Sequence, residues 1–263
     1  MINGKDMNPI LLLVVMASSS IIAGGIWGFI PGISKAKYNT NETLFTLMMN
    51  YIAIQLTSYC VSKWENPPGS NSVGLINGTG QYKSAGWIGN LFSKGYNGDY
   101  AILTICVLIL AILVYIYLKK TKQGFEISVI GDSPDTARYS GMRIEKVFVR
   151  TMTLSGALCG LAGFFAVAGV SHTISTQTAG GRGFTAIIVA WLAKMNPFVM
   201  ILISLLITFL NKGAVQIASD FSLNEHMSEI ITGIILFFIL GSEFFINYKI
   251  TFINKKNVDK EGV

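Results

Sequence analysis

The sequence predicts an all-α protein: a polytopic transmembrane helical bundle of about seven spans, one of them short or broken, with a short helix on its cytoplasmic side. Hydrophobic residues make up 51% of the 263 residues and charged residues only 13%, whereas soluble domains carry roughly a quarter charged residues. Several apolar runs approach the roughly 20 residues that a spanning helix needs. Basic residues gather in the short segments between these runs, so the net charge of +6 does not indicate nucleic-acid binding.

The apolar runs define the expected spans in order along the chain. Six are clear, at residues 10–30, 44–61, 100–118, 147–170, 198–210 (or 198–217) and 230–246. A seventh run, 183–195, is apolar but covers only roughly 20 Å of a core about 30 Å thick. It follows a glycine-rich stretch, and we expect Pro197 to stop its helix. Counting this run as a crossing makes the distribution of charge consistent.

Lysine and arginine predict the orientation, because cytoplasmic loops carry an excess of both. We expect the segment 119–146 to be a cytoplasmic loop, since it and the residues just after it hold a dense basic set: Lys119, Lys120, Lys122, Arg138, Arg143, Lys146 and Arg150. The longer segment 62–99 is poor in basic residues and rich in Gly, Asn and Ser, which favours an extracytoplasmic loop. This arrangement places the N terminus outside and the C terminus inside.

Small residues predict close helix packing within the bundle. Gly24, Gly28 and Gly32 lie at four-residue spacing in the first span, and Gly156, Gly160 and Gly163 form a similar stripe in the fourth. Such stripes allow the backbones of two helices to approach each other closely. We interpret both as packing faces rather than as substrate sites.

Polar and glycine-rich positions inside the bundle are candidates for a translocation path. Asn50 and Tyr51 lie in the second span, where polar groups must face protein or water; hydrogen bonding between helices explains them equally well. Gly181, Gly183 and Phe184 open the short seventh run, and a glycine-interrupted half-helix commonly lines a path in transporters. The nearby Arg182 is either an interfacial arginine or a contact to a partner or solute.

The segment 129–150 predicts a capped helix in the cytoplasmic loop. Ser133 can cap a helix that begins at Pro134, Asp135 suits the positive N-terminal end, and Gly141 can close the other end. The helix would run for about two turns and present Arg138 and Tyr139. Two interpretations stay open, a solvated loop and a docking element for a soluble partner.

Several chemistries lack a sequence signature. A phosphate-binding GxxxxGK[ST] loop, an HExxH metal motif and a GxSxG nucleophile are absent from the 263 residues. The three cysteines fall in apolar runs without metal-ligand spacing. We therefore expect no metal, no cofactor and no enzymatic activity in this chain.

Three blocks of sequence resemble a known family. Residues 24–53 (GGIWGFIPGISKAKYNTNETLFTLMMNYIA), 129–142 (VIGDSPDTARYSGM) and 181–197 (GRGFTAIIVAWLAKMNP) look like the permease subunits of bacterial ABC importers. The resemblance covers nearly the whole chain and is nearest to nucleoside (guanosine-type) and simple-sugar permeases. It implies a single permease domain over residues 1–263 in the bacterial plasma membrane, forming the path for such a solute in contact with membrane lipid.

The resemblance also implies partners and a role for the capped helix. The partners are a cytoplasmic ATP-binding subunit, a second permease subunit in a homo- or heterodimer, and an extracytoplasmic solute-binding lipoprotein. The capped helix would be the coupling helix that docks on the ATPase. The positions on the family's pattern are Gly131, Pro134, Ala137, Arg138, Tyr139 and Gly141, with Asp132 standing where the family usually has asparagine.

The chain is short for this family, whose members typically have about ten spans. We interpret it as a permease that lacks the family's N-terminal helices, which also accounts for the N terminus outside. Two alternatives remain at this point. One is a secondary carrier or channel that works without ATP; the other is a truncated permease without function.

Overall fold

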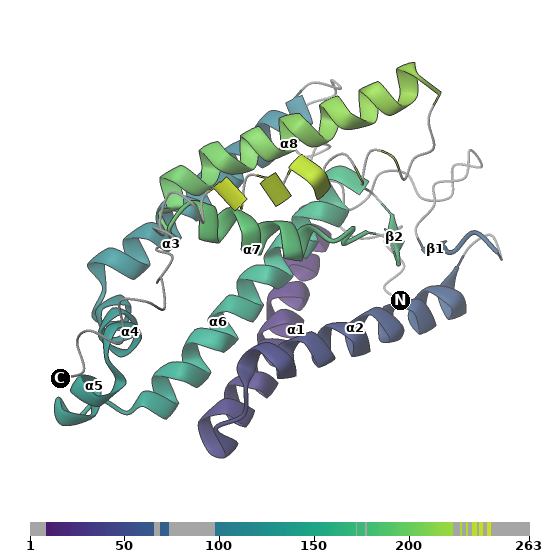
Figure 1. Ribbon diagram of the computed structural model, residues 1–263. Coiled ribbons are helices and arrows are strands. Elements are labelled where there is room, and N and C mark those ends of the chain that lie inside the picture. Colours follow the sequence, from purple (N-terminus) through teal and green to yellow (C-terminus); the bar gives the residue numbers. More distant parts are fainter. Residues whose placement is uncertain are drawn as a thin grey trace, which may run out of the picture. The chain divides into compact units, whose positions relative to one another are not determined.

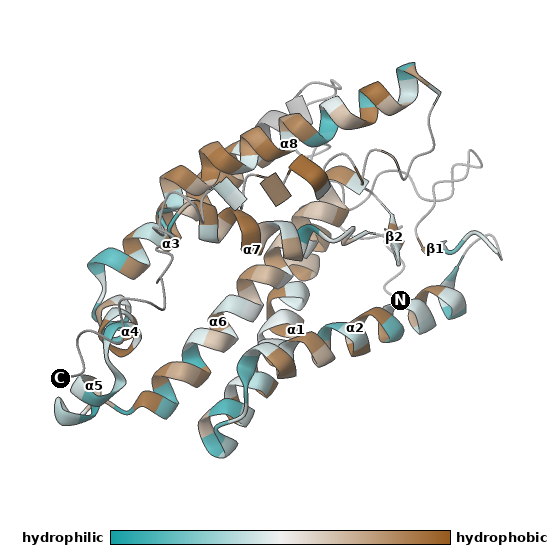
Figure 2. Ribbon diagram, in the orientation of Figure 1, coloured by the Kyte–Doolittle hydropathy of each residue, from teal (hydrophilic) through white to brown (hydrophobic). Residues whose placement is uncertain are grey.

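The computed structural model describes residues 9–65, 69–73, 98–171, 173–176, 178–222 and parts of 227–242, and these residues are almost entirely helical. The chain divides into two compact units, residues 1–180 and 181–263. Figure 1 shows the helices, and Figure 2 shows apolar residues along them with hydrophilic residues at the helix ends of the first unit. The predicted all-α, polytopic class is confirmed.

The described residues of the first unit form six helices, a π-helical turn and two very short strands. Its elements in order are α1 (Pro9–Tyr38), α2 (Glu42–Trp64), β1 (Ser72–Val73), α3 (Gly98–Lys120), α4 (Lys122–Asp132), α5 (Pro134–Tyr139), α6 (Ile144–Phe165), the π-helical turn η2 (Ala166–Ser171) and β2 (Ile174–Ser175). The second unit contains α7 (Arg182–Leu192) and α8 (Pro197–Asp220).

Five helices in the described residues are long and apolar enough to cross a membrane, and α7 is a shorter apolar helix. The five long helices and α7 together correspond, in order, to the first six expected crossings along the chain. The expected span at 230–246 lies largely outside the described residues, so the total of seven stays a prediction. Figure 2 shows the apolar stretch on α8.

The centre of the first unit is the pair α1 and α6, which lie side by side (Figure 1). The two predicted glycine stripes meet here. A Cβ atom on Gly28 would lie 2.5 Å from the Met152 carbonyl oxygen, and one on Gly24 would lie 2.9 Å from the Gly160 Cα. These separations leave no room for a side chain, so glycine allows the backbone contact. Gly163 was expected to belong to the packing face, but a Cβ there would meet nothing within 4 Å among the described residues, so Gly163 does not take part in this contact.

Two helix boundaries differ from the expected ones. α1 continues through Pro31 to Tyr38, because spanning helices tolerate proline where neighbouring protein satisfies the freed backbone groups. α7 ends at Leu192, before Pro197, and the chain turns through left-handed φ angles of 49° at Lys194 and 58° at Met195. Pro197 therefore starts α8, where Asn196 Oδ1 accepts a hydrogen bond from the Phe198 N–H at 3.2 Å, instead of stopping α7.

The segment 119–146 contains a helix, α4, that the sequence interpretation missed. Thr121 caps it, with the Thr121 Oγ1 accepting from the Gly124 N–H at 3.2 Å. Gly124 is buried against the end of α3, where a Cβ would lie 2.5 Å from the Leu118 carbonyl carbon. The tight α3–α4 turn thus depends on glycine, and α4 and α5 form a structured arm between α3 and α6.

A short strand pair and a helix contact lie at the end of the first unit that is away from this arm. β1 and β2 pair antiparallel, with Ser72 opposite Ser175 and Val73 opposite Ile174. Gly169 of η2 lies against the Leu103 side chain of α3, where a Cβ would lie 2.5 Å from the Leu103 Cδ1. These contacts tie the chain after α2, the start of α3 and the end of α6 together.

Candidate functional site

The arm ends in α5, a helix of six residues with a cap at each end. Ser133 has extended backbone angles, and its Oγ accepts a hydrogen bond from the Thr136 N–H at 3.4 Å. Pro134 takes the first helical position, which needs no N–H donor. At the other end Gly141 adopts a φ of 75°, and the Met142 N–H donates to the Ala137 carbonyl oxygen at 3.0 Å. The predicted capping is therefore present.

One face of α5 is fixed and the other is open to the surroundings. Ala137 is completely buried, with 0% of its surface exposed, whereas Tyr139 is 93% exposed. The Arg138 guanidinium lies 3.4 Å from the Asp135 carboxylate, and both side chains are largely exposed. α5 is thus anchored through a small residue and presents an aromatic ring beside an arginine–aspartate pair; aromatic residues and arginine are enriched at protein interfaces.

An ion pair holds the base of the arm. The Arg150 Nη2 on α6 lies 3.0 Å from the Glu126 Oε2 on α4, with the two side chains 36% and 23% exposed. Because these residues are 24 positions apart, the pair fixes α4 against α6 rather than stabilising one helix. Through the glycine contact, α6 is in turn packed against α1. Contacts thus connect α5 to α1 through α4 and α6.

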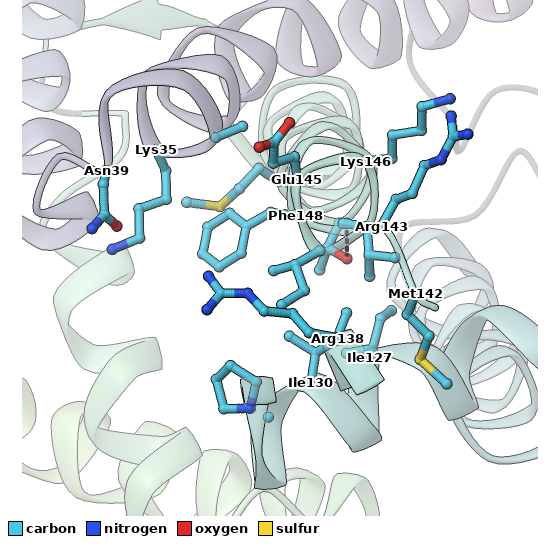
Figure 3. Close-up of a pocket in the computed structure, with 17 residues that line it drawn as sticks. Lys35, Asn39, Ile127, Ile130, Arg138, Met142, Arg143, Glu145, Lys146 and Phe148 are labelled. Carbon is cyan, nitrogen blue, oxygen red and sulfur yellow. Dashed lines mark hydrogen bonds between the residues drawn. The ribbon is translucent and has the colours of Figure 1, made fainter. Parts of the chain in front are cut away.

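A groove of about 1050 Å³ lies between this arm and the ends of α1 and α6. We call it the arm groove. Ile127, Ile130 and Phe148 supply apolar walls, and Figure 3 shows Lys35 and Arg138 reaching toward the same open space from different elements. The groove therefore combines apolar walls with positive charge.

The turn between α1 and α2 is also stabilised locally. Asn41 Oδ1 accepts hydrogen bonds from the backbone N–H groups of Thr43 and Leu44, at 3.0 and 3.3 Å. The Lys35 Nζ lies 2.8 Å from the Glu42 carboxylate. Lys35 also lines the arm groove, so this ion pair holds one of the charged side chains of the groove in place.

The residues expected to dock on an ATPase lie together at the end of the arm. Gly131 and Asp132 end α4, Pro134, Ala137, Arg138 and Tyr139 form α5, and Gly141 follows it. Gly131, Pro134 and Arg138 line the arm groove. A Cβ on Gly131 would meet nothing within 4 Å among the described residues, so packing inside this unit does not explain that glycine.

The residues expected to line a translocation path fall in both units. Asn50 and Tyr51 lie on α2 in the first unit, and the Tyr51 side chain is 69% exposed. Gly181 precedes α7 in the second unit with a φ of 70°, and Gly183 and Phe184 belong to its first turn. Their role in a path stays a prediction.

The sequence interpretation missed Glu126, Lys35 and Glu42 as structural members of this site, and took Arg150 only as a basic residue. A signal for α4 was present in Thr121, a good N-cap residue, ahead of the apolar positions Ile127 and Ile130. The partner of Arg150 could not be identified without knowing how α4 lies against α6.

Known proteins are similar to this chain in sequence. The family described as "Branched-chain amino acid transport system / permease component" matches residues 1–240. The chain is 30% identical over 258 residues to the guanosine ABC transporter permease protein NupP of Bacillus subtilis, covering 97% of this chain and 69% of that protein. It is 28% identical over 240 residues to the nucleoside ABC transporter permease protein NupB of Lactococcus lactis, covering 89% and 65%.

A third relative is the glucose ABC transporter permease protein TsgB13 of Haloferax volcanii, which is 27% identical over 249 residues, covering 92% of this chain and 64% of that protein. The chain therefore spans between 64% and 69% of the length of these three relatives. No solved structure matches it. The chain belongs to the permease component family of branched-chain amino acid transport systems, and its long apolar helices make it a multi-pass protein of the inner membrane.

Proposed function

We propose that this chain is a permease subunit of an ABC importer, that it forms part of the translocation path for a nucleoside or simple-sugar solute, and that α5 docks on a separate cytoplasmic ATP-binding subunit. The observation that carries the docking proposal is the construction of α5. It is capped at both ends, anchored through the buried Ala137, and presents the 93% exposed Tyr139 beside the Arg138–Asp135 pair.

The proposed mechanism follows from how the arm is attached. ATP binding on the partner moves the surface that holds α5. The Glu126–Arg150 ion pair passes this displacement to α6, and the backbone contact of Gly28 with Met152 passes it to α1. In this mechanism the partner supplies the free energy of ATP hydrolysis, and this chain supplies the translocation path and the arm that transmits the movement.

The proposed solute class rests on the names of the relatives, and the other proposed partners rest on the family to which the chain belongs. Two of them are named for guanosine or nucleoside transport and one for glucose transport. We accordingly propose a nucleoside or simple sugar, a second permease subunit and an extracytoplasmic solute-binding lipoprotein. In the proposed orientation, Asn50 and Tyr51 of α2 and Gly181, Gly183 and Phe184 at the start of α7 line the path.

Co-purification of this chain with the proposed ATP-binding subunit, both expressed in the same cells, tests the docking proposal. Arg138→Glu and Tyr139→Ala should each weaken the complex at least about tenfold, because an exposed aromatic residue and an arginine are typical binding hot spots. Lys122→Glu reverses one exposed charge at the first position of α4, where an acidic residue suits the helix end, and serves as the control for Arg138→Glu. Tyr59→Ala is the control for Tyr139→Ala, since Tyr59 is 64% exposed near the far end of α2.

The α5 variants and the control variants should give different results. Both α5 variants should lose the complex and the stimulation of ATP hydrolysis while both controls keep them. Unchanged complex formation and ATPase stimulation in both α5 variants would remove the docking proposal. Solute flux into ATP-free vesicles, driven by a concentration gradient alone, would instead favour a carrier or channel.

A further inference from the structure

A second groove follows the α1–α6 pair. It has a volume of about 680 Å³, and we call it the α1–α6 groove. Phe29 and Ile33 line it from α1, and Val149 and Leu154 line it from α6. Phe29 is 44% exposed and Leu154 is 39% exposed, so the apolar wall is open to the surroundings.

One end of the α1–α6 groove is charged. Lys37 lies near the end of α1, and Lys146 lies in the first turn of α6, at the same end of the antiparallel pair. In the part of the chain that the structure describes, ion pairs from Lys37 and Lys146 are absent. Arg150 also lines this end but is paired with Glu126, and Glu145 is the acidic residue of the lining. Lys37, Lys146 and Glu145 each lack an ion pair in the described residues, so the net charge that remains open there is positive.

The dimensions of the groove match one leaflet of a membrane. Along α6 the lining runs from Glu145 to Ala157, twelve positions, or about 18 Å at 1.5 Å per residue. Half of a hydrocarbon core of about 30 Å is about 15 Å. The Thr153 hydroxyl, also in the lining, donates to the Val149 carbonyl oxygen at 2.8 Å, so it presents no free donor to the groove.

We propose that the α1–α6 groove is a binding site for an anionic phospholipid. The phosphate lies at Lys37 and Lys146, and an acyl chain follows the apolar wall of Phe29, Ile33, Val149 and Leu154. Charge complementarity selects this occupant, because a row of apolar side chains that ends in unpaired lysines at the membrane boundary fits a lipid with a negative headgroup. A transmembrane protein segment without an acidic residue at this level would fill the apolar part but bring no anion to the lysines.

The site has a physical consequence for the protein. The lipid would bridge the two helices at the end where the arm joins α6, next to the backbone contact of Gly32 with Val149. It would hold α1 and α6 together where the glycine contact ends. This proposal does not depend on which solute is transported or on docking of an ATPase.

Native mass spectrometry of the full chain tests the proposal. The chain is reconstituted in nanodiscs of phosphatidylcholine with a minor fraction of phosphatidylglycerol, then released, and the phosphatidylglycerol retained per chain is counted. Loss of one lysine contact to the bound phosphate should lower retention about fivefold, so Lys37→Gln with Lys146→Gln should lower it about thirtyfold. The double variant Lys37→Arg with Lys146→Arg should keep the lipid.

A matched control separates a site from general attraction to a charged surface. Lys120→Gln with Lys122→Gln removes the same charge from exposed lysines at the α3–α4 junction, outside the α1–α6 groove. This variant should retain phosphatidylglycerol like the unmodified chain. Equal retention by the Lys37/Lys146 glutamine variant and this control would overturn the proposal, as would an unmodified chain that retains no phosphatidylglycerol.

A second measurement identifies the occupant in native membranes and does not require charge variants. Photoreactive benzoylphenylalanine at Leu154 should form an adduct with lipid. An adduct with another polypeptide, whether a second copy or a different subunit, would show that protein covers the α1–α6 groove and would overturn the proposal.

Discussion

The backbone contact between α1 and α6 gives the sharpest stability prediction, which concerns the substitution Gly28→Ala. The added Cβ would lie 2.5 Å from the Met152 carbonyl oxygen and 3.0 Å from the Gly156 Cα, both of them backbone atoms. Ordinary contacts of this kind lie near 3.5–4.0 Å, so the helices would have to separate by about 1 Å. Overpacking of this type costs about 1–3 kcal/mol, and alanine gains at most about 1 kcal/mol over glycine from helix propensity.

Gly25→Ala is the matched control on the same helix. Its Cβ would lie 3.8 Å from the Ala157 Cβ, an ordinary contact, and it carries the same gain in helix propensity. The gain in helix propensity cancels between the two variants. The free energy of unfolding, measured by reversible unfolding in mixed micelles, should therefore differ by the overpacking cost of about 1–3 kcal/mol, with Gly28→Ala the less stable. Equal values for the two variants would refute the proposed close approach of the helices.

Three further predictions concern the arm. Glu126→Gln should lower the free energy of unfolding by about 1–2 kcal/mol, a cost between those of breaking an exposed and a buried ion pair. The charge exchange Glu126→Arg with Arg150→Glu should restore part of this lost stability. Ser133→Ala removes the cap of α5 and should cost about 1 kcal/mol, seen as faster amide hydrogen exchange at Thr136; unchanged exchange there would contradict the cap. Gly141→Val should weaken ATPase coupling more than Gly131→Val, because Gly141 has a φ of 75° that a β-branched residue does not readily adopt, and equal effects would contradict this reason.

Much of the fold could be predicted from the sequence because membranes impose simple rules. Length and hydropathy predict spanning helices, since every backbone group in the hydrocarbon must be hydrogen-bonded. The glycine stripes predict close packing, and the contact of Gly28 with Gly156 confirms it. Gly163 continues its stripe but meets no neighbour in the described residues. The sequence could not predict this, because residue spacing alone does not say where two packed helices diverge.

The candidate site was predictable where local chemistry determines it. Ser133, Pro134 and Gly141 define the caps of α5 through short-range geometry, and the structure has them in those roles. The Glu126–Arg150 pair depends on the packing of two helices that are distant in sequence, so no local pattern predicts it. α4 was missed because a short amphipathic helix inside a basic loop resembles a solvated connection.

The central claim is that α5 faces the cytoplasm and is covered there by an ATP-binding subunit. The direct measurement places a cysteine at Tyr139 in a chain whose Cys60, Cys106 and Cys159 are replaced by serine, and labels it with a membrane-impermeant maleimide. We expect no labelling in intact cells, rapid labelling in inverted vesicles stripped of the ATP-binding subunit, and protection when that subunit is added back. Labelling from outside intact cells, or labelling that the added subunit leaves unchanged, would contradict the account.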